Sequence, residues 1–177
     1  MKIIDKTTLI ESDNQYGVDQ NAKSIWIDVL PVDALPSDEK EVERIYRRAK
    51  QLRQINRMSR AIIGRGKSRF RSAVKIIPCL VARTIGSDYW LNRIDILTRS
   101  CKWDESDYVG IISMGLYGPA ERMPKAEYEI STDICFEGHV FQTMSCWDSY
   151  LKNLYHDYMK LPPEEARRTH EYRAYKL

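Results

Sequence analysis

The stretch SIWIDVLPVDALP, residues 24 to 36, decides how the chain is interpreted. Its first half is an apolar run typical of a buried strand. Pro31 and Pro36 end that run, because proline cannot donate to a sheet ladder. A carboxylate, Asp28, stands in the middle of it. The sequence therefore predicts a strand over residues 24–30 that places an acid among apolar neighbours.

Asp28 needs a partner if this strand is buried. Side chains alternate along a strand, so Asp28 shares a face with Trp26 and Leu30. A buried, unpaired carboxylate costs several kcal/mol or takes up a proton, and a metal ion, an arginine or backbone donors would satisfy it. Strand carboxylates that hold a divalent cation are common in phosphoryl transfer. The residues alone favour a structural acid over a metal ligand, and they predict that Asp33 is a turn residue.

The rest of the chain predicts an α+β fold with a small sheet and several flanking helices. Apolar residues recur at helical spacing after Ser37, which is a suitable N-cap. Two further helices are expected over about 70–85 and from Ser87 onward, and a last one after Ser145. Short strands are expected over residues 2–10, 108–114, 130–136 and 140–144, the last two as a hairpin. Residues 1–177 are predicted to form one domain.

Positive charge is concentrated in one part of the chain. Residues 44–83 hold 13 of the 28 Lys and Arg residues and none of the 25 Asp and Glu residues. Such a block indicates a phosphate-rich or anionic partner, although a solvated helical face remains an alternative. Only Tyr46 and Phe70 are aromatic within it, so phosphates or anionic lipid fit better than the bases of a nucleic acid.

Cysteine and histidine patterns give no metal motif. The four cysteines lack C-x-x-C spacing, and the three histidines have no ligand spacing with other residues, so no zinc site is expected. No signal peptide or membrane-spanning stretch is evident, and a cytoplasmic protein is predicted.

Two segments carry a family resemblance. The first is WIDVLPVDALP, and the second is FEGHVFQTMSCWDSYLKNLYHDYMKLPPEEARRTH near the carboxyl end. Both resemble the LicD family, the choline-phosphate transferases of bacterial surface polysaccharides, and IDKTTLIE and YGPAE also fit. The resemblance spans essentially the whole chain, with residues 37–105 matching only in their helical character.

This resemblance implies a truncated nucleotidyltransferase-like fold with a basic helical insert at about 37–100. Family members carry an upstream segment with a glycine turn and clustered aspartates, and this chain is expected to be the carboxy-terminal portion that lacks it. Asp28 corresponds to the third carboxylate of the family's metal site. The family usually has glycine at the position of His156.

The resemblance also implies an activity. A phosphoryl-alcohol group such as phosphocholine would move from a CDP-activated donor to a cell-surface glycan, with Mg²⁺ or Mn²⁺ as the divalent metal. Asp28 would be a metal ligand or the base, and Glu121 a second catalytic residue. Four more residues would bind substrate: Tyr155, Asp157, Arg167 and Arg168. Each also has a structural interpretation, Tyr155 as a core residue and the two arginines as a solvated helix end.

Two expectations concern this chain alone. Because a single carboxylate holds a metal poorly, the chain is expected to be inactive or weakly active by itself. A non-catalytic binding module is the rival interpretation, in which the basic helices bind an anionic glycan, a membrane surface or a partner. For the phosphotransferase, whose acceptors the resemblance implies to be lipid-linked or membrane-bound glycans, the 13 cations lead us to expect peripheral attachment at the anionic inner face of the membrane.

Overall fold

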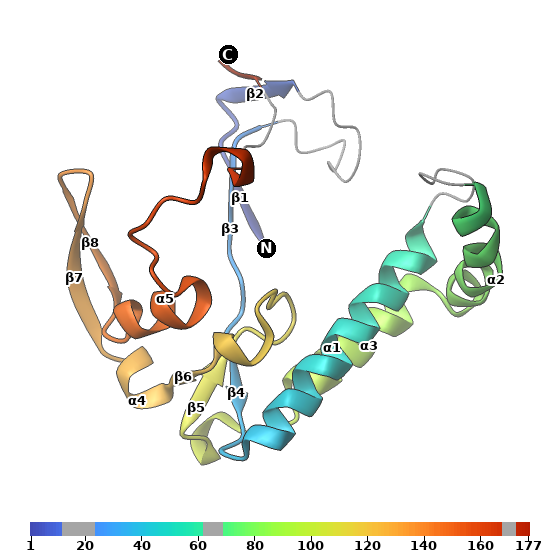
Figure 1. Ribbon diagram of the computed structural model, residues 1–177, viewed down its shortest axis with the longest axis horizontal. Coiled ribbons are helices and arrows are strands. Elements are labelled where there is room, and N and C mark those ends of the chain that lie inside the picture. The colour runs from blue at the N-terminus through green and yellow to red at the C-terminus, as the bar shows by residue number, and fades with distance from the viewer. Residues whose placement is uncertain (12–23, 62–68, 168–172) are drawn as a thin grey trace. The chain divides into compact units, whose positions relative to one another are not determined.

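The computed structural model describes residues 1–11, 24–61, 69–167 and 173–177 (Figure 1). The chain divides into two compact units, residues 1–30 with 157–177 and residues 31–156. The described residues form helices and small separate sheets, so the expected α+β class is confirmed. The prediction of one domain stays a prediction, because compactness does not test whether a unit folds alone.

The first unit consists of two short antiparallel ribbons. Strand β1 (Lys2–Ile4) pairs with β3 (Trp26–Asp28), and β2 (Thr8–Glu11) pairs with β9 (Arg173–Lys176). The α-amino group of Met1 donates to the carbonyl of Val29 at 2.9 Å. Of the strand predicted over residues 24–30, the central part, Trp26–Asp28, is thus present. Its expected burial is wrong, because a two-stranded ribbon leaves Ile27 67% exposed.

A three-stranded antiparallel sheet begins the second unit. Its order is β4 (Asp33–Leu35), β5 (Tyr108–Gly110) and β6 (Met123–Pro124). Asp33 pairs with Gly110 in this ladder, so its prediction as a turn residue is wrong. The physical reason is that the proline at position 31 ends one ladder and leaves the chain free to start another two residues later.

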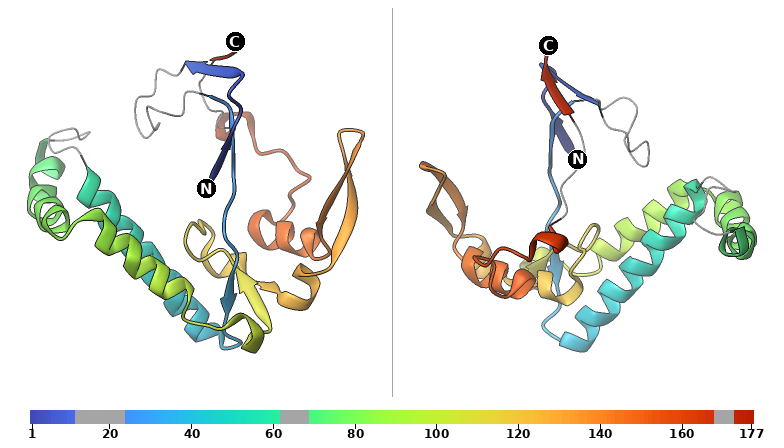
Figure 2. Two further views of the ribbon diagram at one scale, coloured as in Figure 1. Left: turned by 180° about the vertical axis from the view of Figure 1, so that it is seen from behind. Right: turned by 45° about the horizontal axis from the view of Figure 1, so that its top comes forward.

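Three helices follow β4. They are α1 (Glu39–Arg60), α2 (Arg69–Ile85) and α3 (Ser87–Thr98), and α1 and α3 run side by side (Figure 2). The first helix is capped by Asp38, whose side chain accepts from the amide of Lys40 at 3.2 Å, and not by Ser37 as expected. The predicted helices are otherwise present, and Pro78 lies inside α2.

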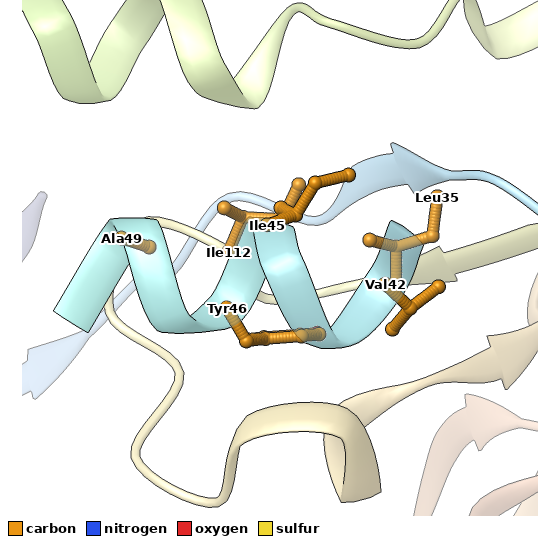
Figure 3. Packing of buried hydrophobic residues seen from close by; sticks show 6 residues of the cluster. All are labelled: Leu35, Val42, Ile45, Tyr46, Ala49 and Ile112. Carbon is orange, nitrogen blue, oxygen red and sulfur yellow. The ribbon is translucent and has the colours of Figure 1, made fainter. Parts of the chain in front are cut away.

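The main hydrophobic core joins α1 to the sheet. Helix α1 contributes four residues at helical spacing, and β4 and the segment after β5 contribute one each (Figure 3). These residues are Leu35, Val42, Ile45, Tyr46, Ala49 and Ile112. The spacing that predicted α1 therefore also identified the face that packs.

The remaining elements are a hairpin and short helices. Two 3₁₀ turns, η1 (Trp103–Glu105) and η2 (Gly118–Glu121), flank β5, and α4 (Lys125–Tyr128) follows β6. Strands β7 (Ser131–Phe136) and β8 (His139–Met144) form the predicted hairpin. Its two turn residues, Glu137 and Gly138, have φ of 50° and 79°, as a tight two-residue turn requires.

Helix α5 (Trp147–Tyr155) begins after Cys146, not Ser145, and ends earlier than expected at His156. The φ of His156 is 61°, a conformation that favours glycine. A third 3₁₀ turn, η3 (Glu164–Ala166), follows in the first unit. Within the described ranges, no helix combines the length and apolar character needed to cross a bilayer.

Candidate functional site

The loop that follows β5 is held to α1 by one arginine. The guanidinium of Arg53 donates to the carbonyls of Ile112, Ser113 and Gly115 at 2.8, 3.1 and 2.8 Å. Gly115 is required here, since an added Cβ would lie 2.1 Å from the carbonyl oxygen of Ile111. The loop therefore lies against the helix through these hydrogen bonds to its backbone, in addition to the apolar packing of Ile112 in the core.

Glu121 holds the same loop by accepting hydrogen bonds from the loop's backbone amides. The turn η2 brings this side chain back under the loop, where it is only 4% exposed. Its Oε1 accepts from the amides of Leu116 and Tyr117 at 3.1 and 3.3 Å, and its Oε2 accepts from the hydroxyl of Tyr150 at 2.8 Å. Three donors satisfy a carboxylate that burial would otherwise destabilise.

Four tyrosines surround this carboxylate. Burial raises the pKa of Tyr46 and of Tyr150, and the charge of Glu121 raises both further. Hydrogen bonding with Tyr117, together with burial, raises the pKa of Tyr155 to about 12. The rings of Tyr117 and Tyr155 meet edge to face at 5.2 Å. The hydroxyls of Tyr46, Tyr150 and Tyr155 therefore keep their protons at neutral pH, so they can donate hydrogen bonds but not act as anions.

An open cleft of about 430 Å³ lies between α1 and the loop over residues 115–119. Its volume is in the range of small-molecule sites. Arg47, Lys50 and Arg53 line one wall, and Leu116 and Tyr117 belong to the other. Glu43 is the acid among the lining residues, so the cations outnumber it by three to one. This charge favours an anionic ligand such as a phosphate ester.

Asp28 lies in the first unit and is exposed to solvent, whereas Glu121 is buried in the second unit. Asp28 is the last residue of β3, opposite Lys2 in the ladder. It makes no hydrogen bond or ion pair with another residue that the structure describes. Across the described ranges, no three His, Cys, Asp or Glu residues gather as a metal site would require. Asp28 offers one hard oxygen donor, which does not by itself make a metal site.

The other predicted substrate residues divide between the units. Tyr155 belongs to the second unit and lies in the tyrosine cluster around Glu121, half exposed. Asp157 and Arg167 belong to the first unit and make local contacts: the carbonyl of Asp157 accepts from the amide of Lys160, and Arg167 donates to the carbonyl of Pro162 at 2.8 Å. Arg168 lies outside the described residues.

Sequence analysis did not single out several residues of the candidate site. Four of them line the cleft, namely Arg47, Lys50, Arg53 and Tyr117, and the fifth, Tyr150, donates to Glu121. The first three recur at a spacing of three along α1, which puts them near one side of a helix. The two glycines of GLYGP, residues 115–119, also signalled a close approach of backbone. The long-range contact between Tyr150 and Glu121 left no signal in the sequence.

A comparison with known proteins found a curated relative of part of the chain. The chain is 38% identical over 68 residues to the lipopolysaccharide cholinephosphotransferase LicD of Haemophilus influenzae, strain KW20. Part of this chain is thus related to LicD. The match covers 37% of the chain and 25% of the relative, so the chain spans about a quarter of the length of that protein. No protein-family profile matches the chain, and no solved structure matches it.

Proposed function

We propose that this chain is part of a LicD-type phosphotransferase. In this proposal it helps to move a phosphoryl-alcohol group, such as phosphocholine, from a CDP-activated donor to a cell-surface glycan. The observation that carries the proposal is the 38% identity to a protein named as a cholinephosphotransferase of lipopolysaccharide. The nucleotidyltransferase-like fold and the cytoplasmic location are parts of the same proposal.

The cleft supports this proposal through its charge. Transfer of a phosphoryl group depends on positioning and on stabilisation of negative charge, with little covalent chemistry from the protein. Arg47 and Lys50 are exposed cations on one wall, available to diphosphate oxygens. Arg53 and Glu121 hold the opposite wall in place, so we assign them to positioning.

Asp28 is proposed as the metal ligand or the base. A divalent metal such as Mg²⁺ or Mn²⁺ would neutralise charge on the transferred phosphate. The described residues supply one carboxylate toward it, so no step of this proposal is derived through the metal. The exposed position of Asp28 supports the assignment, because nothing in the described fold needs its charge.

Replacing Asp28 by Asn in the native gene tests the proposal. Phosphoryl-alcohol groups on the surface glycan are then measured by mass spectrometry, with the protein level followed by immunoblot. We expect decoration to fall by at least about 100-fold, the scale of a lost catalytic group, at an unchanged protein level. Asp104→Asn, another exposed acid, is the matched control. Full decoration with Asp28→Asn contradicts the proposal.

The 177-residue chain alone is expected to transfer phosphocholine from CDP-choline weakly or not at all. The measurement is radiolabel transfer to lipopolysaccharide with and without Mg²⁺ or Mn²⁺. Rapid metal-dependent turnover by this chain would show that one described carboxylate is enough, and would refute the expectation.

The second candidate function is a non-catalytic binding module for an anionic glycan, a membrane surface or a partner. The cations of α1 favour it, since none of them forms an ion pair with an acid in the part of the chain that is described. In this case Asp28→Asn leaves surface decoration unchanged, while reversal of Arg47 and Lys50 abolishes binding. A nucleic-acid partner is the least favoured, and would show as strongly salt-dependent binding to duplex DNA.

A further inference from the structure

Helix α2 exposes a broad apolar face. Five large side chains on it are exposed, with Ile77 at 73% and Val81 at 54%. At 100° per residue, they fall within one half of the helix circumference. This α2 apolar face consists of Ile76, Ile77, Leu80, Val81 and Ile85. The other side of the helix is also apolar, since Cys79 and Ala82 are buried.

Such a face is costly to leave in water. Full burial of a Leu, Ile or Val side chain is worth about ten-fold or more in an equilibrium constant. Contiguous exposed apolar surface on this scale marks a place where a protein or a membrane binds. The described fold buries Cys79 and Ala82 of α2 but leaves Ile77 and Val81 mostly exposed, so an occupant that covers them lies outside the described fold.

The surrounding charge indicates which occupant fits. Residues 44–83, which include most of α1 and α2, contain 13 cations and no acid. Six of the cations project from α1 into solvent: Arg44, Arg47, Arg48, Lys50, Arg57 and Arg60. On α2, Lys75 is exposed, and Arg83 donates to the carbonyl of Ala61 at 2.8 Å. Each cation near an anionic leaflet strengthens binding about five-fold.

The β7–β8 hairpin provides a contrast within the same unit. Phe136 and Val140 are exposed there by 63% and 69%, as much as the apolar residues of α2. Two acids, Asp133 and Glu137, accompany them on the hairpin. Apolar exposure together with uncompensated positive charge is therefore a property of α2 and its neighbour α1, and not of every exposed element.

We propose that α2 binds in the interface of a membrane rich in anionic lipid, with its apolar face at the level of the acyl chains and the nearby cations among the headgroups. Amphipathic helices with exposed apolar and basic residues bind membranes in this way. The proposal goes beyond phosphotransfer and does not depend on it. The charge of residues 44–83 alone indicates only attraction to a phosphate-bearing partner. The apolar face of α2 adds a surface that can insert among lipids.

Vesicle co-sedimentation tests the proposal. The 177-residue chain is mixed with vesicles of phosphatidylcholine alone or with three-tenths phosphatidylglycerol. We expect at least about ten-fold stronger binding to the anionic vesicles. Ile77→Glu with Val81→Glu should reduce that binding at least about 100-fold, because each substitution loses apolar burial worth at least about ten-fold in binding. Val140→Glu on the hairpin is the matched control and should bind as the unchanged chain does.

Salt separates insertion from simple attraction. Chain already bound to anionic vesicles should remain partly bound after a wash in 1 M salt, because burial of apolar area is not screened, whereas the Ile77→Glu, Val81→Glu variant should be released. Circular dichroism and thermal melting confirm that both variants fold. Equal binding to the two kinds of vesicle overturns the proposal, as does unchanged binding by the double variant. Dissociation of a dimer by the double variant, with vesicle binding unaffected, would assign the face to self-association and also overturn it.

Discussion

The two carboxylates that the sequence singled out, Asp28 and Glu121, lie in opposite environments. Asp28 ends a two-stranded ribbon and is exposed, without a partner in the described residues. Glu121 is almost fully buried and accepts three hydrogen bonds, from two loop amides and a tyrosine hydroxyl. An acid with its oxygens occupied holds the fold together, whereas an acid with free oxygens is available to a ligand.

This difference separates stability from activity. Removal of Glu121 should unfold part of the cleft wall. Removal of Asp28 should leave the fold intact and change only what the protein does. The catalytic role expected of Glu121 stays a prediction, and four measurements on the free energy of unfolding can sharpen or break the contrast.

The largest effect on stability is expected for Glu121→Ala. The substitution leaves the amides of Leu116 and Tyr117 and the hydroxyl of Tyr150 without their acceptor, which should cost about 3 kcal/mol. Urea unfolding followed by circular dichroism measures the loss. Glu127→Ala, at a nearby exposed acid, is the control and should cost little. Equal stability of the two variants would remove the structural role given to Glu121.

Arg53→Met should cost somewhat less, about 2 kcal/mol. The three carbonyls that Arg53 binds belong to the same loop, but they can be partly rehydrated at the open cleft. Arg57→Met, one helical turn further on the exposed side of α1, serves as the control. The same urea experiment applies, and a loss no greater than that of the control contradicts the positioning role.

Asp33→Asn is expected to stabilise the protein by about 1 kcal/mol at pH 7, because Oδ2 of Asp33 is buried without a hydrogen-bond partner among the described atoms. Burial raises the pKa of Asp33, despite a hydrogen bond from the backbone of Ile112. A raised folded-state pKa means that Asp33 favours folding at low pH and that this contribution is lost as pH rises. The difference between variant and native chain should therefore vanish near pH 3. Thermal melts at both pH values measure it, and a constant difference would reject this account.

Asp28→Asn should have the smallest effect, within about 0.5 kcal/mol, as is usual for exposed positions outside the core. Thermal melting of the 177-residue chain gives the value. A clear loss of stability would instead support the structural ion pair that the residues alone favoured, and it would weaken the assignment of Asp28 to chemistry.

Local patterns predicted the helices and the hairpin well. The buried positions of α1, from Val42 to Leu52, follow from helical spacing, and the β7–β8 turn follows from Glu137 and Gly138. Errors of one residue at the caps, such as Ser37 for Asp38, arise because adjacent residues can both cap a helix.

Long-range pairing explains what the sequence did not reveal. Asp33 joins a strand only because Gly110 lies beside it, and Glu121 becomes a loop anchor only because Tyr150 reaches it from α5. Neither partner is close in sequence, so neither contact has a local pattern. A relation to LicD could be predicted from linear motifs, because the order of residues along the chain does not depend on packing, and the match over 68 residues supports it.

The two-sided anchoring of the loop after β5 has a thermodynamic consequence for binding. Its carbonyls are held by Arg53 and its amides by Glu121, so the backbone of this cleft wall is ordered in the free protein. Leu116, 79% exposed, is held out toward solvent by the same contacts. A ligand that enters the cleft does not have to order this wall, and less of its interaction energy is lost to conformational entropy. Even a few contacts with a phosphate group can then give measurable affinity.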